Sequence, residues 1–272
     1  MRPSCCIAAA ASILGLLAAG TAEAEVVRVG GTGTATALMQ SLGKAYADGG
    51  EEERIVVIPS LGSNGAIRAV IDGALDVAVS ARPPTPKEEA AGLVTLAAMK
   101  TPFGLVSSRK NPPGLGKNDI AALYNSERAT WPDGFPLRLV LRPRSESDTA
   151  LAGAFFPGMR EAIERARART DVPVAATDQA NADLAERLEG SLTAATLTQI
   201  RMETRPLSFV DIDGAKPTLE NLETGAYPYA KTLYLVALKP SRAAVASFNA
   251  FLHSTKGGMA LRAGGVLPAT GS

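Results

Sequence analysis

Three short polar stretches in this chain combine residue types that suit the binding of a small anion. They are Gly30–Thr34 (GGTGT), Gly62–Gly65 (GSNG) and Arg144–Thr149 (RSESDT). Each stretch lies between a segment with the pattern of a strand and a segment with the pattern of a helix. A helix start offers unpaired N–H donors and partial positive charge, glycine allows close backbone approach, and hydroxyl groups donate hydrogen bonds in several directions. The three turns together predict an anion site.

Each turn taken alone has a simpler interpretation. Serine, threonine, asparagine and glycine are the ordinary residues of helix caps and turns. Their number and placement favour a shared site, because ligands of open α/β sheets gather beyond the carboxyl ends of the strands, where such turns converge.

The elements that must position these turns read as repeated strand, turn and helix units. The strands are nearly continuous apolar runs, which is typical of a sheet covered on both faces. We expect an α/β fold with two lobes, the first made of residues 25–107 and 228–272 and the second of residues 108–227. Within residues 93–110 we expect two strands separated by a break around Pro102.

The first 24 residues have the pattern of a cleaved signal peptide. Arg2 precedes an apolar run, and Ala22–Ala24 (AEA) form a small-x-small cleavage signal. Cys5 and Cys6 both lie in this segment, so the mature chain contains no cysteine. We therefore expect a periplasmic protein that is exported without disulfides.

Composition excludes several classes of function. The 272 residues carry a formal net charge of +1, without the basic excess of a nucleic-acid-binding protein. His253 is the only histidine and has no neighbouring cysteine, so we expect no metal and no cofactor. We expect no enzyme either, because the chain lacks a G-x-S-x-G elbow, a Walker-type loop and a carboxylate–histidine cluster.

The turns and their surroundings resemble a known family. VGGTGTATALMQSLGKAY and SLGSNGAIRAVIDGALDVAVSARPPTPKE are similar to the opening of phosphate-binding proteins of ABC transporters, and similar landmarks continue through nearly all of the mature chain. The resemblance implies a type II periplasmic-binding-protein fold, in which two lobes of mixed sheet and helices close on a ligand in the cleft between them. It also implies a monomeric receptor that captures inorganic phosphate, or a similar oxyanion, for a permease in the inner membrane.

The resemblance also implies a set of ligand-binding residues. The first lobe would supply residues of its first two turns and two residues that follow the returning strand: Thr32, Gly33, Thr34, Ser63, Asn64, Gly65, Ser80 and Arg82. The second lobe would supply an arginine and the start of a helix: Arg142, Ser147, Asp148 and Thr149.

This sequence departs from the family pattern at two positions. Asp148 stands where the family has glycine, and Ala81 stands where better-known members have a carboxylate that accepts the ligand's proton. Asp148 then either accepts that proton, repels the anion, or simply stabilises the start of its own helix. Asp148 or Asp178 would substitute for the missing acid, although Thr177 and Asp178 also fit plain helix capping.

The two arginines and the function each have an alternative interpretation. Arg142 fits an ion pair with Asp148 or Glu146 across its own turn, and Arg82 fits a surface position beside two prolines. The alternative functions are binding of another oxyanion, and ligand sensing or a structural role in a relative that has lost phosphate binding.

Overall fold

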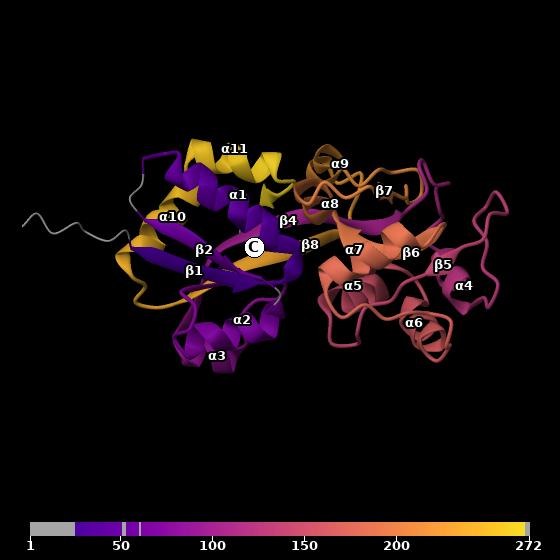
Figure 1. Cartoon of the computed structure of the whole chain (residues 1–272), viewed down its shortest axis with the longest axis horizontal. Coiled ribbons are helices and arrows are strands. Elements are labelled where there is room, and N and C mark those ends of the chain that lie inside the picture. Colours follow the sequence, from indigo (N-terminus) through magenta and orange to yellow (C-terminus); the bar gives the residue numbers. More distant parts are fainter. Residues whose placement is uncertain (1–24, 51–52, 60, 270–272) are drawn as a thin grey trace, which may run out of the picture.

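The computed structural model describes residues 25–50, 53–59 and 61–269; the expected signal peptide lies outside them. Figure 1 shows two bodies side by side, each with strands inside and helices outside. The first half of the chain forms β1 (Val26–Gly31), η1 (Gly33–Ala35), α1 (Thr36–Ala47), β2 (Arg54–Ile58), α2 (Gly62–Ile71), β3 (Val77–Ser80), α3 (Pro86–Ala90), β4 (Leu93–Ser107), α4 (Ile120–Asn125) and β5 (Arg138–Leu139).

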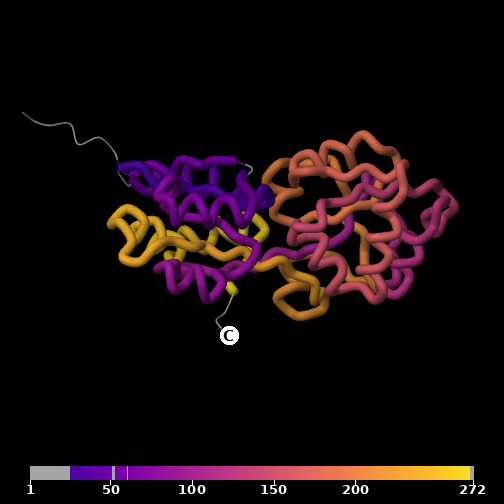
Figure 2. Tube along the Cα trace, turned by 90° about the horizontal axis from the view of Figure 1, so that it is seen from below, coloured from indigo at the N-terminus to yellow at the C-terminus, as the bar shows by residue number. Residues whose placement is uncertain are grey.

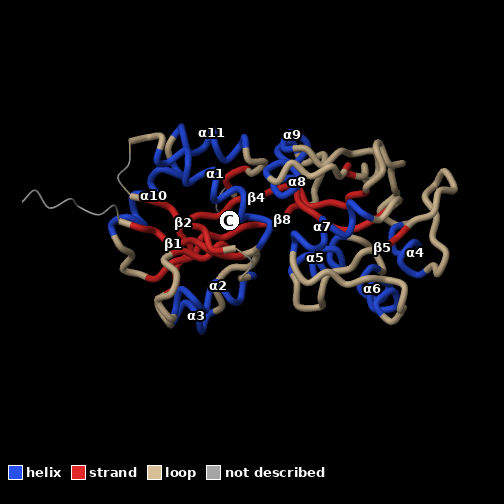
Figure 3. The backbone as a smooth tube through the Cα atoms, in the orientation of Figure 1, coloured by secondary structure: helices blue, strands red, loops and turns tan. Residues whose placement is uncertain are grey.

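The second half adds more helices and completes the sheet. Its elements are α5 (Ser147–Phe155), α6 (Met159–Arg167), α7 (Asp178–Arg187), β6 (Ser191–Thr196), α8 (Leu197–Met202), β7 (Ser208–Phe209), α9 (Leu219–Thr224), β8 (Ala230–Leu238), α10 (Ala243–His253), α11 (Thr255–Ala263) and β9 (Leu267–Pro268). Figure 3 shows the strands running through the middle of both bodies.

The strands lie in the order β2-β1-β3-β8-β4-β6-β5, and β7 and β9 also pair with β4. β1 is parallel to β2 and β3, β6 is parallel to β5, and β4 is antiparallel to both β8 and β6. Helices α1 and α11 lie on one side of the first body's strands, and α2 and α3 lie on the other (Figure 1). The mixed α/β architecture predicted from the sequence is confirmed. The residue boundaries predicted for the two lobes stay a prediction.

β4 is one strand of 15 residues, so the break expected at Pro102 is wrong. Phe103 donates its N–H to the carbonyl of Tyr229, so the nitrogen of Pro102 faces the opposite edge of β4. On that edge β9 pairs with Met99 and Lys100, and β6 begins to pair only at Phe103. Proline fits here because no neighbouring strand needs its missing N–H. β4 therefore continues from one body into the other, as Figure 2 shows.

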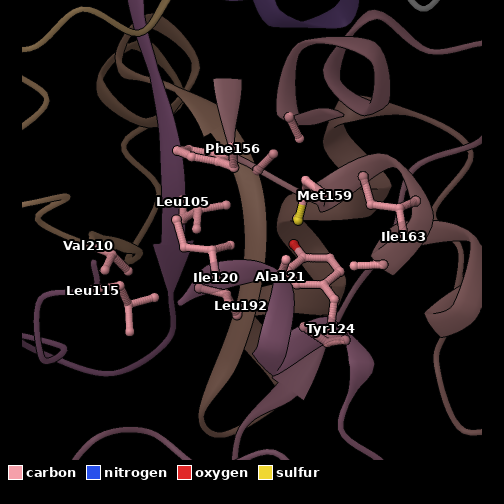
Figure 4. Packing of buried hydrophobic residues seen from close by; sticks show 14 of the residues in the cluster. Leu105, Leu115, Ile120, Ala121, Tyr124, Phe156, Met159, Ile163, Leu192 and Val210 are labelled. Carbon is pink, nitrogen blue, oxygen red and sulfur yellow. The ribbon is translucent and has the colours of Figure 1, made fainter. Parts of the chain in front are cut away.

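Each body has its own apolar core. The core of the second body joins helices α4, α5 and α6 to β4 and β6, and Figure 4 shows Leu105, Ile120, Phe156, Met159 and Leu192 packed within it. The core of the first body lies mainly between α1, α10, α11 and the strands β1, β3 and β8. A smaller cluster covers the other side of this sheet beneath α2.

The first of the three turns is fixed by a close approach of two strands. At Gly31 a Cβ atom would lie 2.0 Å from the carbonyl oxygen of Val79, so only glycine fits there. The next residue, Thr32, donates its N–H to the same carbonyl at 2.9 Å. This contact holds the end of β1 against β3 and places η1 at the junction between the two bodies.

Candidate functional site

The second and third turns lie on opposite sides of one cleft between the two bodies. The cleft has a volume of about 410 Å³. From the first body it is lined by the start of α2 and the residues after β3, and from the second by the loop before α5 and the start of α5: Leu61, Gly62, Ser63, Asn64, Gly65, Ala81, Arg82, Arg144, Ser145, Glu146, Ser147, Ala150 and Leu151. Both helix starts present unpaired N–H donors. Two positive helix ends thus meet at one cleft, an arrangement that suits an anion.

Local hydrogen bonds shape the first body's side of the cleft. Ser63 accepts the N–H of Ala81 at 2.9 Å, which ties the start of α2 to the end of β3. Ser80 is buried and donates its hydroxyl to the carbonyl of Arg82 at 2.7 Å. Ser80 therefore stabilises the turn after β3, whereas Asn64 and Gly65 are exposed on the cleft.

Arg82 lines the cleft but is paired within its own body. Its guanidinium donates to both carboxylate oxygens of Glu88 at 2.8 Å and to the Oδ1 atom of Asn64. This guanidinium, together with hydrogen bonds from Thr85, lowers the pKa of Glu88 to about 2, although partial burial acts in the opposite direction. The sequence also allowed Arg82 to be a simple surface residue beside two prolines. The structure shows it half-buried and paired with Glu88.

The first turn does not line this cleft. Thr32, Gly33 and Thr34 are buried at the junction of the two bodies, where η1 meets the start of α7. The N–H of Thr34 donates to the Oδ2 atom of Asp178 at 3.1 Å, and the amide of Gln179 donates to the carbonyl of Gly33 at 3.1 Å. Both bonds join segments more than 140 residues apart in the sequence.

Arg142 is buried near the same junction. Its guanidinium donates to the carbonyl of Ala175 at 2.6 Å and to Glu146 at 3.1 Å, and its Nη2 atom lies 3.5 Å from the Oδ1 atom of Asp178. The ion pair with Glu146 was one of the alternatives open from the sequence. The contact with Asp178 places one carboxylate between Arg142 and Thr34.

The start of α5 contains a buried ion pair. Asp148 accepts a hydrogen bond from Lys231 of β8 at 2.6 Å, and both side chains are almost without solvent contact. Burial alone would lower the pKa of Lys231, but the carboxylates of Asp148 and Asp178 raise it above its ordinary value. Lys231 therefore stays charged and neutralises the carboxylate that replaces the expected glycine.

The other two predicted site residues of α5, Ser147 and Thr149, have different roles. Ser147 is half-buried and lines the cleft. Thr149 donates its hydroxyl to the carbonyls of Arg142 and Pro143, and thereby fixes the loop before α5. Of the twelve predicted site residues, five line the cleft: Ser63, Asn64, Gly65, Arg82 and Ser147.

Lys231 was not among the residues predicted from the sequence. The only sign of its role in the sequence was a lysine near the start of an otherwise apolar strand. Its partner Asp148 lies 83 residues away, so no local pattern indicates the pair. Thr177 caps α7 by accepting the N–H of Ala180 at 3.0 Å, as the capping interpretation predicted. The side chain of Asp178 does not cap this helix; its carboxylate contacts Thr34 of the other body instead.

Two kinds of feature are absent from the part of the chain that the structure describes. In residues 25–50, 53–59 and 61–269, no three histidine, cysteine or carboxylate side chains are grouped so that they could hold a metal ion. The same ranges contain no helix with the length and apolar character needed to cross a bilayer.

Comparison with solved structures identifies the fold. A protein of Clostridium perfringens, described as a phosphate ABC transporter substrate-binding protein with bound phosphate, aligns with a TM-score of 0.75 and 16% identity, over 90% of this chain and all of that chain. An ABC-type phosphate transport receptor of Vibrio cholerae gives 0.60 and 16%, covering 89% of this chain and 99% of the other. A phosphate-binding protein of Stenotrophomonas maltophilia gives 0.64 and 14%, covering 91% of each chain.

The sequence itself gives a family assignment. The comparison with curated proteins finds no match. The PBP superfamily domain matches residues 18–256, which is most of the chain. The two-body α/β fold and this match agree, and the chain belongs to the PBP superfamily.

Proposed function

We propose that the protein is a periplasmic solute-binding protein that captures inorganic phosphate for an ABC transporter. The observation that carries this proposal is the cleft of about 410 Å³, with the starts of α2 and α5 on opposite sides. A tetrahedral anion held there would accept hydrogen bonds from the fixed N–H groups of both bodies, so that binding draws the bodies together. Structural relatives described as phosphate-binding proteins support phosphate as the ligand.

We propose further that the protein works in the periplasm, beside a permease of the inner membrane. A cleaved signal peptide at residues 1–24 would deliver a monomeric, non-enzymatic receptor to the periplasm. The occupied, closed form would then dock on a permease in the inner membrane. Donors fixed by the fold replace the hydration shell of the anion at low ordering cost.

Calorimetry of the mature protein with phosphate, sulfate and molybdate tests the ligand. We expect heat of binding with phosphate and a much weaker signal with the other two. Ser147→Ala should weaken phosphate binding about tenfold or more, because a hydrogen bond to a charged group contributes about 1.5–3 kcal/mol. Ser241→Ala, an exposed serine of the first body, is the matched control and should bind as the parent does.

The alternatives give different results in the same experiment. Stronger binding of sulfate or molybdate than of phosphate would assign another oxyanion. No binding of any of the three would contradict the proposal and favour a sensing or structural relative. That second candidate has one observation in its favour, since Thr34 and Arg142 already contact a carboxylate of the protein itself.

A further inference from the structure

Asp178 occupies a position at which a bound anion would be expected. One carboxylate oxygen accepts the N–H of Thr34 from the first body at 3.1 Å, and the other lies 3.5 Å from the guanidinium of Arg142 in the second. The Asp178 side chain is only 6% exposed. The protein's own carboxylate therefore uses donors from both bodies at once.

Thr34 and Arg142 each keep one hydrogen-bond donor that Asp178 does not bind. The hydroxyl of Thr34 and the Nε atom of Arg142 are buried and have no hydrogen-bond partner among the described residues. A buried donor without a partner is destabilising, because it has lost its hydrogen bonds to water. A carboxylate has two oxygens, whereas a tetrahedral oxyanion has four and can accept from more of these donors.

An anion cannot simply be added beside Arg142. The cavity that touches Arg142, Asp148 and Thr149 has a volume of about 20 Å³, which holds about one water molecule. That cavity is too small for a tetrahedral ion, and on the side of Thr34 the guanidinium already contacts Asp178, so an ion that contacts both Arg142 and Thr34 takes the place of this carboxylate. Asp148 is held by Lys231 at 2.6 Å, so Asp178 with its longer contacts is the group that can leave.

The side chain of Asp178 can move without unfolding its helix. Thr177, not Asp178, provides the side-chain cap of α7. The backbone of Asp178 is held separately, because its carbonyl accepts the amide of Gln199 at 3.0 Å. A change of the Asp178 rotamer therefore exposes the donors while α7 stays in place.

We propose that Asp178 is an internal competitor of the ligand, and that binding exchanges its carboxylate for a divalent tetrahedral oxyanion at Thr34 and Arg142. This inference rests on the proposed function and adds to its cleft the two buried donors Thr34 and Arg142, which do not themselves line it; Arg142 is joined to the cleft through Glu146. Only molecules whose donors are free can bind, so the apparent Kd equals the intrinsic Kd divided by the fraction of such molecules. Monovalent carboxylates such as acetate bring no more charge than Asp178 and should not displace it.

Two variants of Asp178 test this exchange. Asp178→Asn keeps the shape of the side chain and removes its charge, and we expect it to bind inorganic phosphate about tenfold more tightly than the parent. Asp178→Ala removes the acceptor, and the Thr34 amide should then exchange with solvent deuterium about tenfold faster until phosphate is added. Asp183→Asn, a partly exposed carboxylate of the same helix, is the control for both measurements and should change neither.

The outcomes separate this inference from the proposed function. An unchanged Thr34 exchange rate in a folded Asp178→Ala protein would overturn the internal contact. Faster exchange with weaker phosphate binding in Asp178→Asn would overturn the competitor role and make Asp178 an acceptor of the ligand's proton. Faster exchange without phosphate binding by any variant would support the contact but overturn phosphate as the ligand.

Discussion

At the residue scale, Lys231 and Asp148 show how this chain accommodates a buried carboxylate at a position where the resemblance in the sequence led us to expect glycine. The two charged groups are 2.6 Å apart and have side chains that are 1% and 3% exposed. Removing one partner of such a pair leaves the other charge buried without compensation, which is far more costly than losing a surface pair.

Lys231→Met should therefore destabilise the protein strongly. We expect its free energy of unfolding to fall by about 3–5 kcal/mol in urea denaturation at neutral pH, because Asp148 is then buried alone. Lys100→Met on the neighbouring strand β4 removes an exposed lysine and should change stability by less than about 0.5 kcal/mol. Equal stability of the two variants would show that the buried pair contributes nothing.

The residues of the candidate site were partly predictable from the sequence. Ser63, Asn64 and Ser147 follow from their local setting, because turn residues before an apolar helix pattern mark a helix start. Asp178 and Lys231 were not predictable as partners of Thr34 and Asp148. Their contacts span 144 and 83 residues, and no local pattern encodes a contact at such separation.

At the element scale, the short helix α3 is held by a capping box and an arginine. Thr85 and Glu88 exchange hydrogen bonds at its start, and Arg82 binds the same carboxylate in a bidentate contact. The pKa of Glu88 lies at about 2, below its ordinary value of 4.5. A lowered carboxyl pKa adds stability above the ordinary pKa and loses it as pH falls through the folded value.

Glu88→Gln should remove this pH dependence. At pH 7 we expect the variant to be about 1 kcal/mol less stable than the parent, because it lacks the ionised contact with Arg82. The difference should shrink as pH falls from about 4.5 to about 2, where the parent protonates Glu88. Urea denaturation across this range measures it, with Glu89→Gln as the neighbouring control. A difference that stays constant down to pH 2 would contradict the assignment.

Simple sequence patterns predicted the strands and helices, except for the break expected at Pro102. Alternation of apolar strands and amphipathic helices was enough to predict an α/β fold. Pro102 was misread because a proline normally interrupts a strand. Whether it does so depends on which edge its nitrogen faces, and only the pairing of β4 with β8, β9 and β6 decides that.

At the scale of the whole molecule, β4 and β8 run between the two bodies (Figure 2). Hydrogen bonds also join them, at the junction of η1 and α7 and between α8 and the end of α11. A solute-binding protein needs this junction to open and close, so bonds across it should be few and breakable. The two bonds to Thr34 and Gly33 fit this requirement, because each rests on a single side chain of α7.

Gly33→Ala tests whether these bonds hold the bodies together. A Cβ at Gly33 would lie 2.6 Å from the Oδ2 atom of Asp178 and 2.7 Å from the Oε1 atom of Gln179. The added methyl group must push both side chains away and break their bonds to η1, so we expect a larger radius of gyration in small-angle X-ray scattering. Because only the ends of two flexible side chains must move, the loss of stability should be about 1 kcal/mol. Gly258→Ala in α11 is the matched control, because its Cβ meets nothing within 4 Å. If the two variants scatter alike and unfold alike, the η1–α7 bonds do not set the distance between the bodies.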